Sequence, residues 1–362
     1  MIKKIKLFDP VISDEEKNAV ENVLNSGFWA SGAGTGNVDK FEKKFKTYVG
    51  SKDCIAVNSG TAALDLALSA VNIKNKEVII PSLSFVSTAN SVVSNGGKPI
   101  FAEIDPKTLC IDPNDVEKKI TKNTCAILPV HFAGMTANLT KINKIKKEHN
   151  LTVIEDAAHA CGATFNGKKI GTHGNMVCFS FHPVKNLAMP SGGLISINQS
   201  NFKNLRKSFS AKRWCGITDR KNVFYDVKEM GSNLYMNEFS AAIGLVQLKK
   251  LNRLNNIRKK ISKRYDNEIN LEQKMPYNKN SVYHFYWIQV KNRNQFRKNM
   301  NNVGIETGIH YKPIHTLSMY AKSKHLPITE TVGNSIVTLP THPNLSNSNI
   351  DHIINSVNKF GK

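Results

Sequence analysis

Lys185 lies in a segment whose composition could turn its amine into a nucleophile. The run Phe179-Ser-Phe-His-Pro-Val-Lys185 precedes Pro190-Ser-Gly-Gly193, and the apolar residues 194–197 follow as an expected strand. A lysine in a loop between two strands and beside glycines can be partly desolvated, which lowers its pKa and makes the amine nucleophilic. Most single lysines are solvated surface residues, so this interpretation depends on the motifs that accompany Lys185.

Two further segments could hold a charged, phosphorylated ligand. Ile154-Glu-Asp-Ala-Ala-His159 puts Asp156 at the C-terminal end of an expected strand, where α/β sheets bind ligands. An acid there can keep a heterocyclic nitrogen protonated, as a pyridinium electron sink requires. Asn58-Ser-Gly-Thr-Ala-Ala-Leu64 lies between a strand and a helix, so Gly60 and Thr61 offer backbone N–H groups to a phosphate. The alternatives are a cap or salt-bridge role for the acid and a plain helix cap for the second segment.

The elements that must position these residues alternate along the first part of the chain. A capping box at 13–16 begins a helix expected over 14–26, a glycine-rich loop spans 31–36, and a second helix is expected over 38–49. Expected strands follow at 54–57, 77–80, 99–102, 125–130 and 151–155, separated by helices at 61–71, 85–94, 113–119 and 138–149. This alternation predicts an α/β fold with a mainly parallel sheet covered by helices on both faces.

The second part of the chain has a different pattern. Residues 236–269 carry helical periodicity without a proline and predict one or two long helices. A strand at 282–290 and helices at 293–302 and 347–359 then predict a small α+β domain. Because 362 residues suit one large and one smaller unit, we expect two domains, residues 1–250 and residues 251–362.

Composition excludes several classes of protein. Hydrophobic residues make up 40% of the chain, and no apolar run is long enough to span a bilayer. The segment Met1–Phe8 lacks the apolar core of a signal peptide, so we expect a cytoplasmic protein. The 6 cysteines form no C-x-x-C pair and are expected to be buried free thiols, and no metal site is expected.

The net charge of +22 raises the possibility of a nucleic-acid-binding protein. However, the lysines are spread along the whole chain rather than gathered in a motif, which favours compositional bias. We therefore expect no dedicated nucleic-acid site, although a positive field would help to attract a nucleotide diphosphate.

Taken together, the motifs resemble one family along nearly the whole chain. They are Ser59–Leu64, Pro81–Asn90, Phe101–Pro106, Pro129–Gly134, Glu155–His159, Ser180–Lys185, Gly231–Met236, Gly308–His315 and Leu339–Pro343. In this order they are similar to the DegT/DnrJ/StrS family of nucleotide-sugar aminotransferases, among which perosamine synthases are included. The resemblance implies pyridoxal 5'-phosphate as cofactor. It also implies the fold of type I pyridoxal-phosphate transferases, a large cofactor-binding domain followed by a smaller C-terminal α+β domain.

The resemblance also assigns site residues. Lys185 is expected to form the Schiff base with the cofactor and then to carry the proton, while Asp156 pairs with the pyridine nitrogen. The remaining expected cofactor contacts are Gly60, Thr61 and Ser180 at the phosphate, Phe85 and His159 beside the ring, and Asn233 reaching the phosphate of a neighbouring subunit. A homodimer with shared active sites is therefore expected.

The implied reaction converts a nucleotide-linked keto-deoxysugar to an amino sugar, with L-glutamate as donor, for a surface polysaccharide or another glycoconjugate. Candidate substrate contacts are His182, Lys212, Arg213, His310 and His315. Two departures from the family pattern affect the substrate assignment. Pro190-Ser191 stands where Gly-Glu is usual, and Tyr235 stands where Arg is usual.

Three other functions remain as alternatives. A dehydrase of the same family carries histidine at the lysine position, whereas Lys185 is present here. A non-catalytic regulatory or nucleic-acid-binding protein is favoured only by the net charge. An ordinary amino-acid aminotransferase is disfavoured because the motifs match the sugar family throughout.

Overall fold

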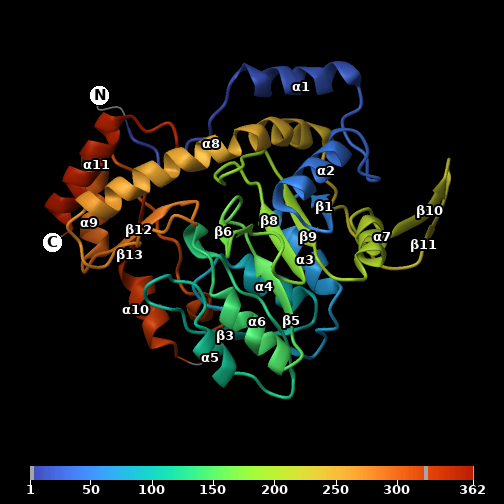
Figure 1. The fold of residues 1–362 in the computed structure, drawn as a ribbon, viewed down its shortest axis with the longest axis horizontal. Coiled ribbons are helices and arrows are strands. Elements are labelled where there is room, and N and C mark those ends of the chain that lie inside the picture. The colour runs from blue at the N-terminus through green and yellow to red at the C-terminus, as the bar shows by residue number, and fades with distance from the viewer. Residues whose placement is uncertain (1–3, 322–324, 362) are drawn as a thin grey trace.

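A seven-stranded sheet forms the centre of the computed structural model, which describes residues 4–321 and 325–361 (Figure 1). Its strands, in spatial order, are β1 (Asp53–Val57), β9 (Gly193–Ile197), β8 (Met176–Ser180), β5 (Thr152–Asp156), β4 (Thr124–Ile127), β2 (Glu77–Pro81) and β3 (Lys98–Ala102). Only β9 runs antiparallel to its neighbours, and the pairs from β8 to β3 are parallel. The predicted mainly parallel α/β sheet is confirmed.

Alternate residues of these strands enter two different hydrophobic cores, one on each face of the sheet. In β5, Val153 packs into one core and Ile154 into the other. Because side chains alternate along a strand, Asp156 lies on the face of Ile154, which is the face covered by α3 and α4. The two-sided burial explains why the strands are continuous apolar runs rather than alternating polar and apolar residues.

Of the helices that cover the sheet, the first six follow the predicted ranges closely, whereas the seventh, α7, was not predicted. They are α1 (Asp14–Ser26), α2 (Asn37–Val49), α3 (Gly60–Ser69), α4 (Ser87–Ser94), α5 (Pro113–Lys118), α6 (Leu139–Glu148) and α7 (Phe202–Lys212). The capping box at the start of α1 is formed, and the helix ends at Gly27, whose φ of 63° suits a residue without a side chain. Local sequence therefore determines where these helices begin and end.

One long helix, α8 (Glu238–Glu268), connects the sheet to the C-terminal part of the chain (Figure 1). That part contains α9 (Arg293–Asn302), α10 (Pro327–Ser335), α11 (Asn347–Phe360) and a two-stranded sheet of β12 (Tyr286–Gln289) and β13 (Ile336–Leu339). The N-terminal segment pairs with it, since Ile5 bridges Ile305. The predicted domain boundary at residue 250 falls inside α8, and the division into 1–250 and 251–362 stays a prediction.

The expected strand at 282–290 is wrong in its first half. Only Tyr286–Gln289 form β12, because the residues before it bond to a turn instead. Val282 N–H donates to Gly134 O at 3.4 Å, and His284 N–H donates to Ala133 O at 2.9 Å. An apolar run rich in aromatic residues predicts extended backbone but does not reveal its partner.

A hairpin that the sequence analysis did not predict projects from the body of the molecule (Figure 1). Its strands are β10 (Ile217–Lys221) and β11 (Phe224–Val227), which follow α7. A second short hairpin joins β6 (Thr164–Phe165) and β7 (Lys168–Lys169). Because the β10–β11 strands are exposed on both faces, they lack the alternating pattern by which strands are recognised.

The expectation of six buried thiols is wrong for two of the cysteines. Cys215 is exposed and Cys125 is half-buried, whereas the other four are buried, and all six are free. In the part of the chain that the structure describes, no helix is both long and apolar enough to cross a membrane. The same described residues contain no cluster of three metal-ligating side chains.

Candidate active site

Asp156 ends β5 with its carboxylate buried and bonded. Its Oδ1 accepts a hydrogen bond from the Ala158 N–H at 3.1 Å, and its Oδ2 accepts one from the Thr88 hydroxyl at 2.9 Å. Since Thr88 donates to Asp156, the hydroxyl of Ser84, 2.8 Å away, donates in turn to Thr88. Burial raises the pKa of Asp156, while these hydrogen bonds and the nearby Lys185 oppose that shift.

Lys185 lies in the loop between β8 and β9, as the sequence predicted. The residue is partly exposed, but its ammonium group is enclosed by protein. Burial lowers the pKa of Lys185 to about 8, and the negative charge of Asp156 acts in the opposite direction. About a tenth of this amine is therefore neutral at pH 7, and able to act as a nucleophile, against less than about a thousandth of an ordinary lysine.

The N-terminus of α3 forms a cradle with the ends of two strands. Ser59 caps the helix, its Oγ accepting from Ala62 N–H at 3.1 Å. A Cβ on Gly60 would lie 2.7 Å from the Cβ of Ser180, and one on Gly193 would lie 2.1 Å from Ser59 O. Glycine is required at both positions by this close approach, and the free N–H groups of the helix are left to face an anion.

His159 and Phe85 both lie next to the ring of Tyr311 at the candidate site. The His159 Nδ1 accepts from Ala133 N–H at 3.4 Å, and its Nε2 lies 3.1 Å from the Tyr311 hydroxyl. The Phe85 side chain is 55% exposed, and its ring centroid is 6.0 Å from that of Tyr311. Burial, followed by the charges of Lys185 and His310, holds the pKa of His159 well below its usual range, so the imidazole is neutral.

These groups fit pyridoxal 5'-phosphate. A buried acid can pair with a ring nitrogen, a desolvated amine can bond to a carbonyl carbon, and a helix N-terminus framed by glycines can take a phosphate. These three functions were predicted for Asp156, Lys185 and the segment around Gly60. The fold brings all three to the C-terminal ends of the strands β5, β8 and β1.

The structure also shows residues that the sequence analysis missed. Ser84 and Thr88 hold Asp156 in place, and Tyr311 holds His159. Ser84 and Thr88 are four residues apart around the start of α4, which is the spacing of one helical face, so a signal existed. Tyr311 is 152 residues from His159, and no local pattern could have paired them.

Two of the candidate substrate residues are committed to interactions inside the protein. The Arg213 guanidinium is fully buried and donates to Glu42 at 2.6 Å and to Ala56 O at 2.8 Å. His315 is buried between the Ser82 hydroxyl at 2.6 Å and the Glu330 carboxylate at 2.9 Å. These placements correct the suggestion that Arg213 and His315 contact substrate, because neither side chain is free to do so.

The other candidates are more accessible. His182 is exposed, three residues before Lys185. His310 is half-buried, with its Nδ1 2.8 Å from the Thr338 hydroxyl. The ammonium of Lys212 lies 3.2 Å from the Ser69 hydroxyl and 3.5 Å from the Glu229 carboxylate.

Asn233 is exposed on the surface of the single chain. Its backbone carbonyl accepts from the Asn58 side chain at 3.1 Å, which places it beside the start of the phosphate cradle. Tyr235, one of the two departures from the family pattern, is half-buried close by in sequence. An exposed Asn233 is compatible with the expected reach to a neighbouring subunit, which stays a prediction.

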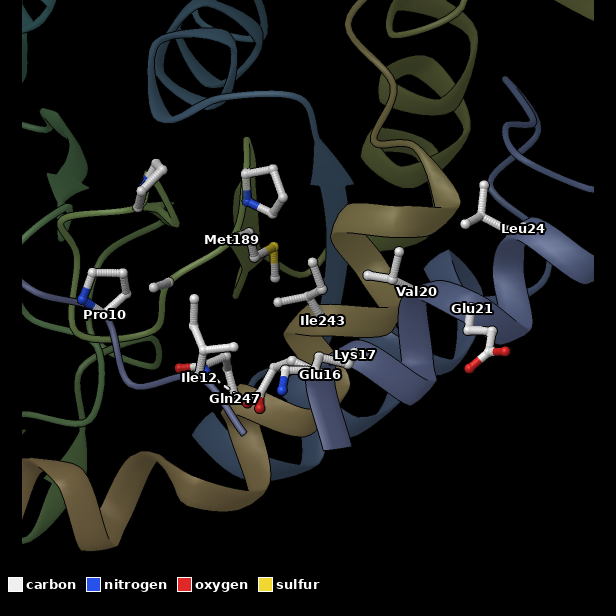
Figure 2. Close-up of a pocket in the computed structure, with 13 residues that line it drawn as sticks. Pro10, Ile12, Glu16, Lys17, Val20, Glu21, Leu24, Met189, Ile243 and Gln247 are labelled. Carbon is white, nitrogen blue, oxygen red and sulfur yellow. Dashed lines mark hydrogen bonds between the residues drawn. The ribbon is translucent and has the colours of Figure 1, made fainter. Parts of the chain in front are cut away.

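A separate apolar pocket is lined in part by the loop that carries Lys185, at Pro183, Ala188, Met189 and Pro190 (Figure 2). It has a volume of about 540 Å³ and is lined by α1, α8 and the segment around Met189 and Pro190. Figure 2 shows Val20 and Leu24 of α1 on one side and Ile243 of α8 beside Met189. Because none of the predicted cofactor residues lines this pocket, it is distinct from the candidate active site.

Comparison with known proteins agrees with this geometry. The model of the DegT/DnrJ/EryC1/StrS aminotransferase family matches residues 10–358. A GDP-perosamine synthase from Escherichia coli O157:H7 is 33% identical, with 99% of each chain covered. A dTDP-3-amino-3,6-dideoxy-alpha-D-galactopyranose transaminase from Aneurinibacillus thermoaerophilus is 35% identical over 96% of this chain and 95% of its own.

Among solved structures, Spr1654 from Streptococcus pneumoniae in its PLP form superposes with a TM-score of 0.93 and 25% identity. The match covers 99% of this chain and 98% of that chain. The same protein is also known in a PMP form, with the same TM-score. The fold described above is thus one that holds this cofactor in both its aldehyde and its amine form.

Proposed function

The chain belongs to the DegT/DnrJ/EryC1/StrS aminotransferase family and is a sugar aminotransferase that uses pyridoxal 5'-phosphate; we propose that it aminates a nucleotide-linked keto-deoxysugar with L-glutamate as donor. The observation that carries the proposal is that Asp156, at the end of β5, acts through its charge on Lys185, which lies in the loop after the adjacent strand β8. The names of the relatives support a nucleotide sugar as acceptor, although their nucleotides differ, GDP in one and dTDP in the other.

In the proposed reaction, different residues of the chain have different roles. Bound pyridoxal phosphate supplies a carbonyl that exchanges for an amine, and a ring that withdraws electrons when its nitrogen is protonated. Asp156 keeps a proton on that nitrogen, because its carboxylate is fixed by Thr88 and Ala158 and cannot rotate away. Gly60 and Thr61 bind the phosphate through the N-terminus of α3.

Lys185 moves the proton. Its pKa of about 8 lies near the working pH, which is where a group that must both take and give a proton is most effective. One amine can serve the donor and the acceptor, since each occupies the same position in turn. The kinetics are therefore expected to be ping-pong.

The proposal includes the side chains around the candidate site. Phe85 and His159 flank the cofactor ring, and Ser180 contributes to the phosphate site through its place at the end of β8. His182 and His310 remain the candidates for substrate contact. The Lys212 ammonium bonds instead to Ser69, the last residue of α3, at the opposite end of that helix from the phosphate cradle.

We further propose a homodimer in which Asn233 reaches the neighbouring subunit, and a cytoplasmic location. The exposure of Asn233 supports the first, and the buried free thiols support a reducing compartment for the second. As the family resemblance implies, the product is proposed to enter a surface polysaccharide or another glycoconjugate. Family membership sets aside the interpretation as a non-catalytic binding protein.

The test is a product assay with purified enzyme, pyridoxal phosphate, L-glutamate and a panel of GDP- and dTDP-linked keto-deoxysugars with the ketone at C3 or C4. We expect one sugar to gain an amino group with release of an equal amount of 2-oxoglutarate. A deoxygenated product that contains no added nitrogen would instead identify a dehydrase. Lys185→Ala serves as the inactive control in the same assay.

A further inference from the structure

We propose that His284 is a positioning residue whose flat ring fixes the orientation of His159 beside the cofactor. The imidazoles of His284 and His159 stack with centroids 4.6 Å apart and planes 28° from parallel. On its other side, His284 stacks on Phe8 at 5.4 Å and 20°. These three rings form a column, which joins the N-terminal segment (Phe8), the segment before β12 (His284) and the segment after β5 (His159). This inference rests on the proposed place of His159 next to the cofactor ring.

A single residue connects the two histidines through the backbone. The Ala133 N–H donates to His159 Nδ1, and the Ala133 carbonyl accepts from the His284 N–H at 2.9 Å. Ala133 has a left-handed backbone with φ of 55°, which a residue with a side chain rarely adopts. A strained residue of this kind persists only where its surroundings hold it, and here both histidines do so.

Gly134 shows how closely these segments meet. A Cβ at this position would lie 2.9 Å from Tyr283 N and 3.0 Å from His159 O. The turn at 133–134 is therefore packed directly between the segment that carries His284 and the segment that carries His159. The turn therefore leaves no room for a side chain between these two segments.

The hydrogen bonds of His159 determine which groups the column positions. Because its Nδ1 accepts from Ala133, the proton of the neutral ring is on Nε2 and is donated to the Tyr311 hydroxyl. Tyr311 is then free to donate its own proton to a group on the open side. The column thus orients both the His159 ring plane and the Tyr311 hydroxyl.

His284 itself has no role as an acid or base. It is buried, and burial together with the positive charge of Lys185 holds its pKa well below the usual range. The groups that face it are His159, His310, Lys185 and Arg258, none of which is a carboxylate. Its ring stays neutral, and its Nδ1 is buried without a hydrogen-bond partner among the described residues. The contacts that the structure shows for this ring on His159 and Phe8 are stacking contacts.

Two substitutions distinguish a role of the flat ring of His284 from a role of its nitrogen atoms. His284→Phe keeps a flat ring and removes the unpartnered nitrogen, whereas His284→Leu keeps burial and removes the ring. The measurement is the ¹⁵N spectrum of histidine side chains in cofactor-free protein, with the His159 signals identified by their loss in His159→Gln. Equilibrium binding of pyridoxal phosphate is measured alongside. Because the spectrum needs no substrate, its result does not depend on which sugar is accepted.

We expect His284→Phe to keep the single Nε2–H form of His159 and the cofactor affinity of the wild type. It should also unfold at an equal or higher temperature, because a buried polar group without a partner is removed. In His284→Leu, His159 should populate both proton positions, and cofactor affinity should fall roughly tenfold. His352→Gln, an exposed histidine on α11, is the control and should change neither readout.

Either of two results would overturn the proposal. If a folded His284→Leu protein keeps the wild-type His159 signals and cofactor affinity, the stack positions nothing. If His284→Phe loses as much as His284→Leu, the nitrogens matter and the ring plane does not. Should His284→Leu fail to fold, His284→Gln removes the ring and keeps a polar side chain, and unchanged His159 signals and cofactor affinity in that variant would overturn the proposal.

Discussion

The candidate active site and the β10–β11 hairpin differ in what a single chain supplies to each. Around Asp156, the polar groups find their partners within the chain, from Ala158, Thr88 and Ser84. On the hairpin, by contrast, Phe224 is 78% exposed, and Val223 is 79% exposed. The candidate active site is therefore bonded within one chain, while the hairpin presents apolar surface that the same chain does not cover.

This difference has a physical origin. The active site lies where parallel strands end, so burial and hydrogen bonds from several segments converge on it. The hairpin extends away from the sheet (Figure 1) and follows α7, with which β10 is in contact. The residues at its base make contacts within the chain, because Arg213 donates to Glu42 and the Arg220 guanidinium lies over the Trp214 ring.

The largest effect on the active-site side of this comparison is expected when the amine of Lys185 is removed. Lys185→Ala should lower turnover by at least about 10⁴-fold, since the cofactor link and the proton carrier are lost together. The measurement is kcat with glutamate and the accepted sugar. Lys203→Ala, an exposed lysine on α7, is the matched control and should retain wild-type turnover. Retained activity in Lys185→Ala would remove the central residue from the account.

Asp156→Asn should have the next largest effect. An amide cannot keep the ring nitrogen protonated, so we expect turnover to fall by about 10³-fold while the protein stays folded. Circular dichroism checks the fold, and steady-state kinetics give the rate. A loss of less than about tenfold would show that the ring is not held as a cation by this carboxylate.

The pH dependence of cofactor attachment tests whether the amine of Lys185 is buried, as the comparison assumes for the active site. The neutral amine of Lys185 is the nucleophile, so the rate at which cofactor-free protein binds pyridoxal phosphate covalently should rise with pH. Because burial lowers the pKa of Lys185 to about 8, the rise should be centred near pH 8 rather than near the ordinary lysine value. A curve centred near pH 10, the value for an exposed lysine, would show that the amine is solvated.

Thr88→Val tests the support of Asp156 with a smaller change. The carboxylate loses one of its two hydrogen bonds and keeps the one from Ala158, so we expect turnover to fall roughly tenfold. Ser84→Ala, one step further from the acid, should lose less. If both substitutions leave turnover and its pH profile unchanged, the hydroxyl chain does not position Asp156.

The smallest expected effect is on the hairpin. Phe224→Ala should change the free energy of unfolding by no more than about 0.5 kcal/mol in a single chain, since the side chain is mostly exposed. Its matched control is Phe209→Ala in α7, where a fully buried ring should contribute about 3 to 5 kcal/mol. A larger loss for Phe224→Ala that grows with protein concentration would show that a second subunit covers the hairpin.

Sequence patterns predicted the parts of this molecule that depend on local periodicity. The capping box and Gly27 define α1, and α8 follows its apolar repeat without interruption. The motifs around Asp156 and Lys185 were also recognisable, because each immediately follows an apolar strand. Those features are encoded within a few residues of one another.

Other features depend on contacts between distant residues and could not be predicted. Arg213 was a candidate for contacting the substrate, yet its partner Glu42 lies 171 residues away along the chain and makes burial of the guanidinium possible. The left-handed Ala133 and its bonds to both histidines are likewise set by tertiary packing. The exposed strands of the hairpin carry no periodicity from which they could be recognised.

The account is tested most directly by the absorbance spectrum of the purified protein with pyridoxal phosphate, recorded before and after L-glutamate is added. We expect a long-wavelength band from the Lys185-linked cofactor, replaced by the shorter-wavelength band of the amine form when glutamate donates its amino group. Lys185→Ala should show neither the first band nor the conversion that starts from it. A wild-type protein that stays colourless with added cofactor, or whose band does not respond to glutamate, would contradict the proposed donor half-reaction.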